Sequence, residues 1–251
     1  MTFEPSRATV ELLDARRTRR LLERLPEGSQ PTSEADAYAI QDLVAQAIGP
    51  VVAWKVGSAT ADSEPFRAPI HRETLFVDPA RVPAKMFHVI GVEAELVYTF
   101  ERDLPVKGAP YSTAAVLDCV GAMMPGIEIV DTRFKVYGGC DPLAHRADQG
   151  NHGALILGAP IRSWRSLVPN SLPVRLEIDG RVACEVVGGN SAVDPVRLLV
   201  WLANEGSHSL GGIRAGQVVT TGSCTGTIFV NSGAVTRATF EGLETLEIKV
   251  D

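Results

Sequence analysis

The stretch Gly91-Val-Glu-Ala-Glu-Leu-Val-Tyr-Thr-Phe100 decides how the rest of this chain is interpreted. Its apolar residues recur at every second position, which is typical of a β-strand whose side chains alternate between two faces. On such a strand Glu93 and Glu95 point to the same side. Two neighbouring carboxylates repel each other, and hard divalent cations bind carboxylate oxygens. The stretch therefore allows two interpretations, a metal site or the solvated face of an amphipathic strand.

A second strand predicted over 125–134 carries another carboxylate. Ile127 and Ile129 share one face, while Glu128 lies on the other face of an otherwise apolar strand. An isolated buried charge is costly without a partner. Glu128 is therefore a candidate third ligand for a cation held by Glu93 and Glu95.

A lysine interrupts the apolar run Val51–Gly57, which reads as a buried strand. Lysine is rarely buried unless it is paired. Lys55 is then either an outward-facing residue of an edge strand or a proton-transfer group whose pKa is lowered by its surroundings.

Composition narrows the class of protein. The 251 residues are 45% hydrophobic and 22% charged, and the net charge is −6 without a long run of either sign. We therefore expect a globular protein with no nucleic-acid partner and no membrane surface partner. The basic cluster 16–20 is interpreted as the solvated face of a helix.

Targeting and redox signals are absent from the sequence. The first five residues lack the apolar core of a signal peptide, and no run of about 18 apolar residues predicts a membrane span. No two cysteines form a CxxC pair, which disfavours both a zinc site and a disulfide framework. We therefore expect a cytoplasmic location. The four cysteines are Cys119, Cys140, Cys184 and Cys224.

The remaining patterns predict helices first and strands later. Helices are expected over 9–25, over 33–48 with Ser33 as N-cap, over 112–124, and from Asp194 onward. Segments 58–68 and 134–153 read as irregular. Further strands are expected over 74–77, 154–158, 174–187 (a hairpin turning at Asp179-Gly180), 217–221, 227–230 and 245–250.

The order of several short motifs resembles a known family. Each motif alone is weak, but their joint order and spacing from about residue 34 onward is similar to the 2-keto-4-pentenoate hydratase and 4-oxalocrotonate decarboxylase branch of the fumarylacetoacetate hydrolase superfamily. The motifs are Lys55-Val-Gly57, Thr74-Leu-Phe-Val-Asp78, Gly91-Val-Glu-Ala-Glu95, Arg102-Asp-Leu-Pro105, Pro125-Gly-Ile-Glu-Ile-Val-Asp-Thr-Arg133, Ala147-Asp148, Leu202-Ala-Asn204, Ala215-Gly216 and Thr221-Gly-Ser223.

The resemblance implies a fold and a site. The fold is of the α+β class, with a mixed, rolled β-sheet core in 51–251 and a helical part in 1–50, all within one domain spanning 1–251. The site is a Mg²⁺ or Mn²⁺ centre, and the protein is expected to be a homo-oligomer. The implied residues are Glu93, Glu95 and Glu128 as metal ligands, Lys55 as the proton-transfer group, and Asp78, Asp148 and Ser223 as substrate-binding residues.

The resemblance also implies a reaction class. The expected function is hydration of a 2-hydroxy-alkadienoate or 2-oxo-alkenoate in aromatic catabolism. A decarboxylase acting on a 2-oxo diacid, a C–C hydrolase of acylpyruvates and a non-catalytic partner protein are the alternatives. A diacid needs a further cation, for which the candidates are Arg67, Arg133, Lys135 and Arg146. Two segments depart from the family pattern and leave the substrate open, Lys55-Val-Gly-Ser-Ala59 and Asp148-Gln-Gly-Asn-His152.

Overall fold

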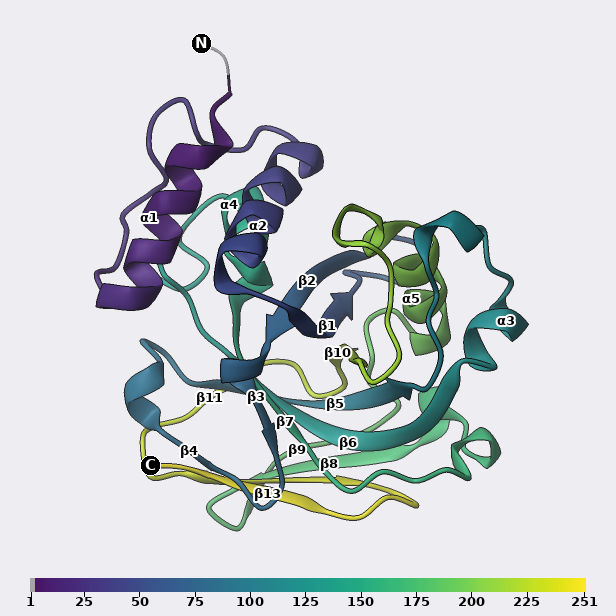
Figure 1. The fold of residues 1–251 in the computed structure, drawn as a ribbon. Helices are drawn as coiled ribbons and strands as arrows, with labels where there is room; N and C mark the ends of the chain where they lie inside the picture. The colour runs from purple at the N-terminus through teal and green to yellow at the C-terminus, as the bar shows by residue number, and fades with distance from the viewer. Residues whose placement is uncertain (1–2) are drawn as a thin grey trace.

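Two mixed β-sheets form the centre of the molecule in the computed structural model, which describes residues 3–251 (Figure 1). Within this range the larger sheet has eight strands in the order β2-β1-β10-β5-β6-β7-β3, with β11 beside β5. The smaller sheet has the order β4-β13-β12-β8-β9. Parallel pairs (β1 with β10, β3 with β7) occur among antiparallel ones. This arrangement confirms the predicted α+β class with a mixed sheet core.

The elements have the following bounds. The larger sheet contains β1 (Val51–Gly57), β2 (Phe66–His71), β3 (Leu75–Val77), β5 (Gly91–Phe100), β6 (Val120–Val130), β7 (His152–Leu157), β10 (Val218–Ser223) and β11 (Ile228–Phe229). The smaller sheet contains β4 (Arg81–Val82), β8 (Pro173–Ile178), β9 (Arg181–Val187), β12 (Val235–Phe240) and β13 (Leu246–Val250). The α-helices are α1 (Pro5–Thr18), α2 (Glu34–Ile48), α3 (Thr113–Leu117), α4 (Pro142–Ala147) and α5 (Pro195–Trp201).

The N-terminal helices confirm one predicted boundary and correct another. The Ser33 hydroxyl caps α2 by accepting the Asp36 N–H. Helix α1 ends at Thr18 rather than at residue 25, because Arg19 adopts a left-handed conformation. The predicted last turn instead forms a bridge in which Leu22 pairs with Phe134. Leu22 is thereby buried by a tertiary contact that helical spacing alone could not reveal.

The predicted helix 112–124 is also shorter in the structure. Helix α3 ends at Leu117, and Val120–Met124 begin β6. These residues pair with β5, for example Met124 with Val97. Sheet pairing therefore overrides the local helical spacing. Two segments expected to be irregular contain short elements, since β2 begins at Phe66 and α4 lies within 134–153.

The two faces of β5 have different surroundings. Val92, Ala94, Leu96 and Tyr98 belong to a core that includes Phe240 and other residues of the smaller sheet. The glutamates of β5 lie on the opposite face, which alternation requires. In Figure 1 α1, α2 and α4 lie away from the smaller sheet, where they share a separate apolar core. The carboxylates are therefore on the face of the larger sheet that does not pack on the smaller one.

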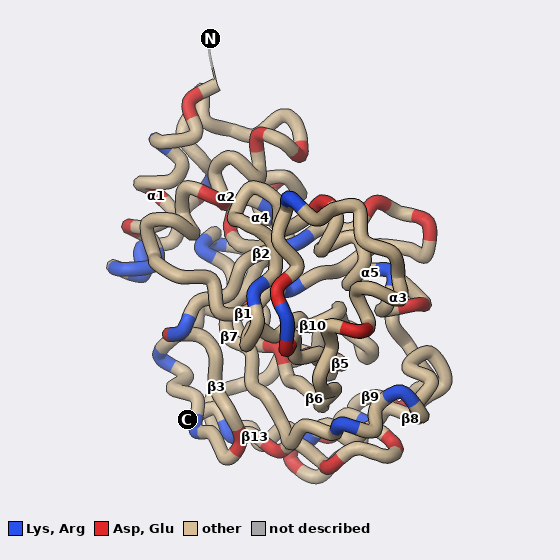
Figure 2. The backbone as a smooth tube through the Cα atoms, turned by 45° about the vertical axis from the view of Figure 1, so that its right-hand side comes forward, with Lys and Arg blue, Asp and Glu red and all other residues tan. Residues whose placement is uncertain are grey.

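Charged residues of both signs are distributed along the backbone, with a basic group where α1 ends (Figure 2). The prediction that cluster 16–20 is a solvated helix face is wrong for Arg16. Its guanidinium donates to Asp148 at 3.1 Å and is only 20% exposed. No helix within residues 3–251 is long and apolar enough to cross a membrane.

Candidate metal centre and active site

Strand pairing brings three carboxylates together. In the antiparallel β5–β6 pair Glu93 lies directly opposite Glu128. Directly opposed residues have Cβ atoms about 5 Å apart, and Glu95 follows two positions later on the same face. One oxygen from each carboxylate lies within 4.8 Å of the others.

Strand β10, which pairs with β5 on the side opposite β6, and the turn after β10 hold the two β5 carboxylates in place. The hydroxyl of Thr220 and the N–H of Gly222 both donate to Oε2 of Glu95, the latter at 3.0 Å. The pairing register shifts between Thr220 and Ser223, and Gly222 has a φ of 82°. This irregularity turns the Gly222 N–H toward the carboxylate, which glycine permits without strain. The Thr227 hydroxyl donates to Glu93.

The third carboxylate contacts a lysine and a histidine. Lys55 Nζ lies 2.8 Å from Glu128 Oε1 and also donates to the Gly150 carbonyl at 3.0 Å. His152 Nδ1 lies 2.9 Å from the same Glu128 oxygen, and its Nε2 lies 3.0 Å from the Thr74 hydroxyl. Glu128 and Lys55 are both buried. The structure thus excludes the interpretation of Lys55 as an outward-facing edge residue.

Burial and mutual repulsion shift the ionisation of this group. Burial, together with the charge of Glu128, raises the pKa of Glu93 and raises that of Glu95 well above its ordinary range. Glu128 is equally buried, but Lys55 and His152 outweigh that effect and lower its pKa. For Lys55 burial acts to lower the pKa, but the three carboxylates together reverse this effect and raise it. The expectation that its surroundings lower the pKa of Lys55 is therefore wrong for the metal-free site, because three negative charges surround the ammonium. The Lys55 ammonium alone does not offset the burial and mutual repulsion of Glu93 and Glu95, since the pKa of each stays raised.

The donor set fits a hard divalent cation. Three carboxylates and one ammonium leave two negative charges in a buried site when all are ionised. Glu128 Oε2 is buried and has no hydrogen-bond partner within residues 3–251, although buried polar atoms are normally satisfied. Carboxylate oxygens are the ligands that Mg²⁺ and related ions prefer. The residues present therefore suit the cation that the sequence led us to expect.

A cavity of about 440 Å³ opens onto the three carboxylates. Lys55 and Ser223 line it, as expected of site residues. Asp78 and Asp148 do not. Asp78 is exposed just after β3, and Asp148 is fully buried, where both of its oxygens accept from Arg133. The structure therefore brings together five of the seven predicted site residues.

Of the four cations considered for a second substrate carboxylate, Arg146 lines this cavity. Arg67 is buried against Asp42, Arg133 is bound to Asp148, and Lys135 pairs with Glu23 on the surface. The Arg146 guanidinium lies 4.4 Å from the centre of the Phe66 ring, which also lines the cavity.

Several residues that build the site were missed in the sequence. His152, Thr220 and Thr227 hold the carboxylates, yet lone histidines and threonines have no distinctive spacing. The turn 221–226 carries a weak signal, since glycines and hydroxyls at a strand end suit an anionic group. In the structure, the carboxylate that accepts from this turn is the side chain of Glu95, through the Gly222 N–H.

Comparison with known proteins places this arrangement in a family. The model of the fumarylacetoacetate (FAA) hydrolase C-terminal family matches residues 43–251. The chain belongs to the fumarylacetoacetate hydrolase family. This family match spans every strand and all the residues that surround the three carboxylates.

This fumarylacetoacetate hydrolase family member is similar in sequence to hydratases and similar in fold to a decarboxylase. The 2-keto-4-pentenoate hydratase of Paraburkholderia xenovorans and 2-keto-4-pentenoate hydratase 3 of Pseudomonas putida are each 26% identical over 219 residues, which cover 83% of this chain and 80% of theirs. Among solved structures, 4-oxalocrotonate decarboxylase from Pseudomonas putida G7, complexed with magnesium and adipate, has a TM-score of 0.87 at 20% identity. That alignment covers 100% of this chain and 99% of the decarboxylase. The likeness confirms the rolled fold of the family.

Proposed function

We propose that this protein is a metal-dependent hydratase that adds water to a small 2-hydroxy-alkadienoate or 2-oxo-alkenoate. The observation that carries the proposal is the buried group of Glu93, Glu95 and Glu128 with Lys55, facing one cavity. The similarity to 2-keto-4-pentenoate hydratases over most of both chains supports the choice of reaction.

Glu93, Glu95 and Glu128 would hold Mg²⁺ or Mn²⁺. When bound, the cation supplies a Lewis acid that polarises the carbonyl of a 2-oxo acid and stabilises the enolate. Thr220, Thr227 and the Gly222 N–H keep two of the carboxylates oriented. A pre-oriented ligand set costs little reorganisation when the cation and substrate bind.

Lys55 is the proton-transfer group in this proposal. Its Nζ is fixed by Glu128 on one side and by the Gly150 carbonyl on the other, beside the cavity. Hydration of a dienol requires a proton at the terminal carbon and a water molecule at the neighbouring position. A lysine held at one point of the cavity wall can donate the first proton and accept another in return.

A second candidate is decarboxylation of a 2-oxo diacid at the same site, and Arg146 favours it. Its guanidinium in the cavity wall offers a partner for a second carboxylate. The decarboxylase of similar fold was solved with adipate, which is a diacid. Loss of CO₂ uses the same electron sink as hydration, so the carboxylate cluster fits both reactions.

A C–C hydrolase is less well supported. Such enzymes use a histidine–glutamate pair to activate water. Within residues 3–251 the histidine that lines this cavity, His145, bonds Asn151 through Nδ1. The ring of His152 does contact Glu128 but lines a different cavity.

A substrate panel tests the proposal. Purified protein is incubated with 2-hydroxypenta-2,4-dienoate and with a 2-oxo-hexenedioate, in Mg²⁺, Mn²⁺ or EDTA, while dienol absorbance and CO₂ release are followed separately. We expect metal-dependent loss of dienol absorbance without CO₂. Release of CO₂ from the diacid would instead identify the decarboxylase, and turnover that persists in EDTA would contradict both.

Three further expectations stay predictions, namely a single domain over 1–251, a homo-oligomer and a cytoplasmic location. The four cysteines are unpaired, as is typical of a reducing compartment. Light scattering coupled to size-exclusion chromatography would measure the mass of the assembly.

A further inference from the structure

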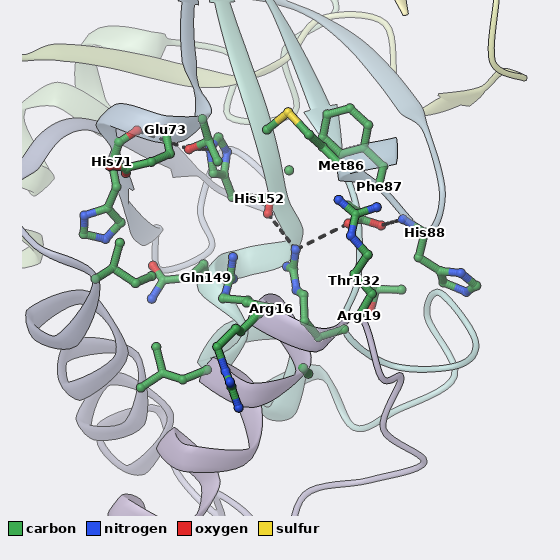
Figure 3. Close-up of a pocket in the computed structure, with 18 of the residues that line it drawn as sticks. Arg16, Arg19, His71, Glu73, Met86, Phe87, His88, Thr132, Gln149 and His152 are labelled. Atoms are coloured by element: carbon green, nitrogen blue, oxygen red, sulfur yellow. Dashed lines mark hydrogen bonds and ion pairs between the residues drawn. The ribbon is translucent and has the colours of Figure 1, made fainter. Parts of the chain in front are cut away.

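A second and larger cavity, of about 870 Å³, lies between α1 and the edge of the larger sheet. Figure 3 shows His71, Gln149 and Arg16 on one side of it and Met86, Phe87 and His88 on the other. The proposed function makes no use of this cavity. His152 lines it, and the same histidine contacts Glu128 of the carboxylate cluster. The cavity therefore lies behind the proposed active site and is distinct from the cavity that opens onto the three carboxylates.

Three polar atoms of the lining residues are buried without partners within residues 3–251: Nε of Arg16, Nε2 of His71 and Oε1 of Gln149. His71 and Gln149 are 6% and 2% exposed. A buried polar atom without a hydrogen bond costs roughly 1–3 kcal/mol. A ligand in the cavity would recover that cost once the side chains that cover these atoms turn aside.

The chemistry of each atom defines what it can bind. The guanidinium Nε–H of Arg16 is a charged donor and calls for an acceptor, best an anion. His71 Nδ1 faces the Pro50 carbonyl at 3.2 Å, so Nδ1 carries the proton and Nε2 of the neutral ring is an acceptor. The Gln149 amide donates through Nε2 to the Gln41 carbonyl at 3.1 Å, which leaves its Oε1 as a second acceptor.

The charged groups around Arg16 decide what this end of the cavity can bind. Arg133, which shares Asp148 with Arg16, also lines the cavity. Burial and the charge of Arg133 lower the pKa of Arg16 to about 10, although Asp148 lies 3.1 Å from its Nη2. The guanidinium of Arg133 also lies 3.6 Å from Asp131, which lines the cavity. Asp131 and Asp148 balance the two guanidinium charges, so the Nε–H of Arg16, which has no partner within residues 3–251, is the donor left for an anion at this end of the cavity.

The rest of the wall is apolar. The side chains of this kind that line the cavity are Val10, Leu13, Leu21, Ile48, Pro69, Met86 and Phe87. They would cover the hydrocarbon part of a ligand, as is typical of small-molecule sites with a few placed polar groups.

We propose that this cavity is a second binding site, for a small organic acid that carries a hydroxyl or amino group on an apolar body. The carboxylate binds Arg16, the hydroxyl or amino donor binds Gln149 and His71, and the apolar body contacts the aliphatic and aromatic wall. The site does not depend on the metal or on the proposed reaction.

Calorimetry with the metal-free full chain tests the proposal, using 4-hydroxyphenylacetate as the probe and phenylacetate as the matched acid without the donor. We expect one probe per chain, bound more tightly than phenylacetate. Arg16→Met should raise the dissociation constants of both acids at least tenfold. Gln149→Leu should raise the dissociation constant of 4-hydroxyphenylacetate to that of phenylacetate. Arg7→Met is the matched control, because Arg7 is an exposed residue of the same helix outside the cavity. This variant should bind both acids with the affinity of the unaltered chain.

A second variant distinguishes loss of the binding site from loss of the fold. Leu13→Trp fills the cavity from α1 without removing a polar contact, and we expect it to abolish binding while the circular dichroism spectrum is unchanged. Three outcomes overturn the proposal: no binding by the unaltered chain at millimolar probe, binding that survives both Arg16→Met and Leu13→Trp, or binding lost in Arg146→Met, which would place the probe in the other cavity. Loss of self-association in Leu13→Trp with no probe binding by the unaltered chain would identify a second copy of the chain as the occupant instead.

Discussion

Lys55 Nζ lies 2.8 Å from Oε1 of Glu128, although β10 and β5 separate their strands in the sheet. Adjacent strands are about 4.8 Å apart, so a flat sheet would place β1 and β6 roughly 14 Å apart. Two side chains reach across that span readily only if the sheet curves toward the face that carries them. The pair thus depends on the roll of the sheet, and it makes the lysine part of the carboxylate cluster.

Replacing Glu95 by glutamine should separate metal binding from folding. The glutamine oxygen can still accept from Thr220 and the Gly222 N–H, and one buried negative charge is lost. Because burial and neighbouring charges raise the pKa of Glu95, its ionised form destabilises the metal-free protein as pH rises. We expect the metal-free variant to be about 1–2 kcal/mol more stable at pH 8 by urea unfolding.

The same variant should lose its response to metal. Saturating Mg²⁺ or Mn²⁺ at about 100 times the dissociation constant would stabilise the unaltered protein by about 2.7 kcal/mol. Glu95→Gln should show little of this gain, while Glu101→Gln, a half-exposed glutamate paired with Arg162, should keep it. An undiminished metal response in Glu95→Gln contradicts the assignment of Glu95 as a ligand.

Replacing Lys55 by methionine should abolish proton transfer while the carboxylates remain. Positioned general acid–base groups contribute roughly 10²–10⁴-fold to rate, so we expect kcat to fall by that factor. Metal should still stabilise the variant, because no carboxylate is removed. Lys107→Met, an exposed lysine in a 3₁₀ turn, is the control and should keep normal turnover. Normal kcat in Lys55→Met excludes the proton-transfer role.

Replacing Arg146 by methionine should distinguish acids with one and two carboxylates. A charge-assisted hydrogen bond contributes about 1.5–3 kcal/mol, so the KM of a 2-oxo diacid should rise roughly 10–100-fold. The KM of a monocarboxylic substrate should stay unchanged. Arg146 also pairs with Glu34 at 2.7 Å, and Glu34→Gln breaks that pair while keeping the guanidinium. If both variants affect mono- and diacids equally, Arg146 acts only through the fold.

Acid should destabilise the protein partly through His71. Burial, and to a smaller extent the charge of Arg16, lowers the pKa of His71 below its ordinary value. The unfolded chain then binds a proton at higher pH than the folded one, so this contribution to stability is present above the unfolded pKa of about 6.5 and is lost as pH falls below it. The free energy of unfolding of His71→Asn should therefore decline less between pH 7 and pH 5. An identical decline in both proteins contradicts this assignment.

Much of the site could be predicted because strand alternation is a local property. The spacing of Glu93 and Glu95 placed both carboxylates on one face, and Glu128 was conspicuous as a lone charge on an apolar strand. Boundaries were predicted less well where tertiary contacts compete with local spacing. Residues 120–124 join β6 because they pair with β5, and Leu22 leaves the helix to pair with Phe134.

The sequence by itself determined the carboxylates, the lysine and the family to which the chain belongs, since these are carried by residue type and spacing within single strands. The tertiary structure alone decided which residues meet. The register of β5 on β6 set Glu93 opposite Glu128, the roll of the sheet brought Lys55 to them, and the end of β10 supplied Thr220 and Gly222. It also placed Arg16 beside Asp148 and formed the second cavity behind His152. Such contacts join segments far apart in the chain, and local periodicity contains no information about them.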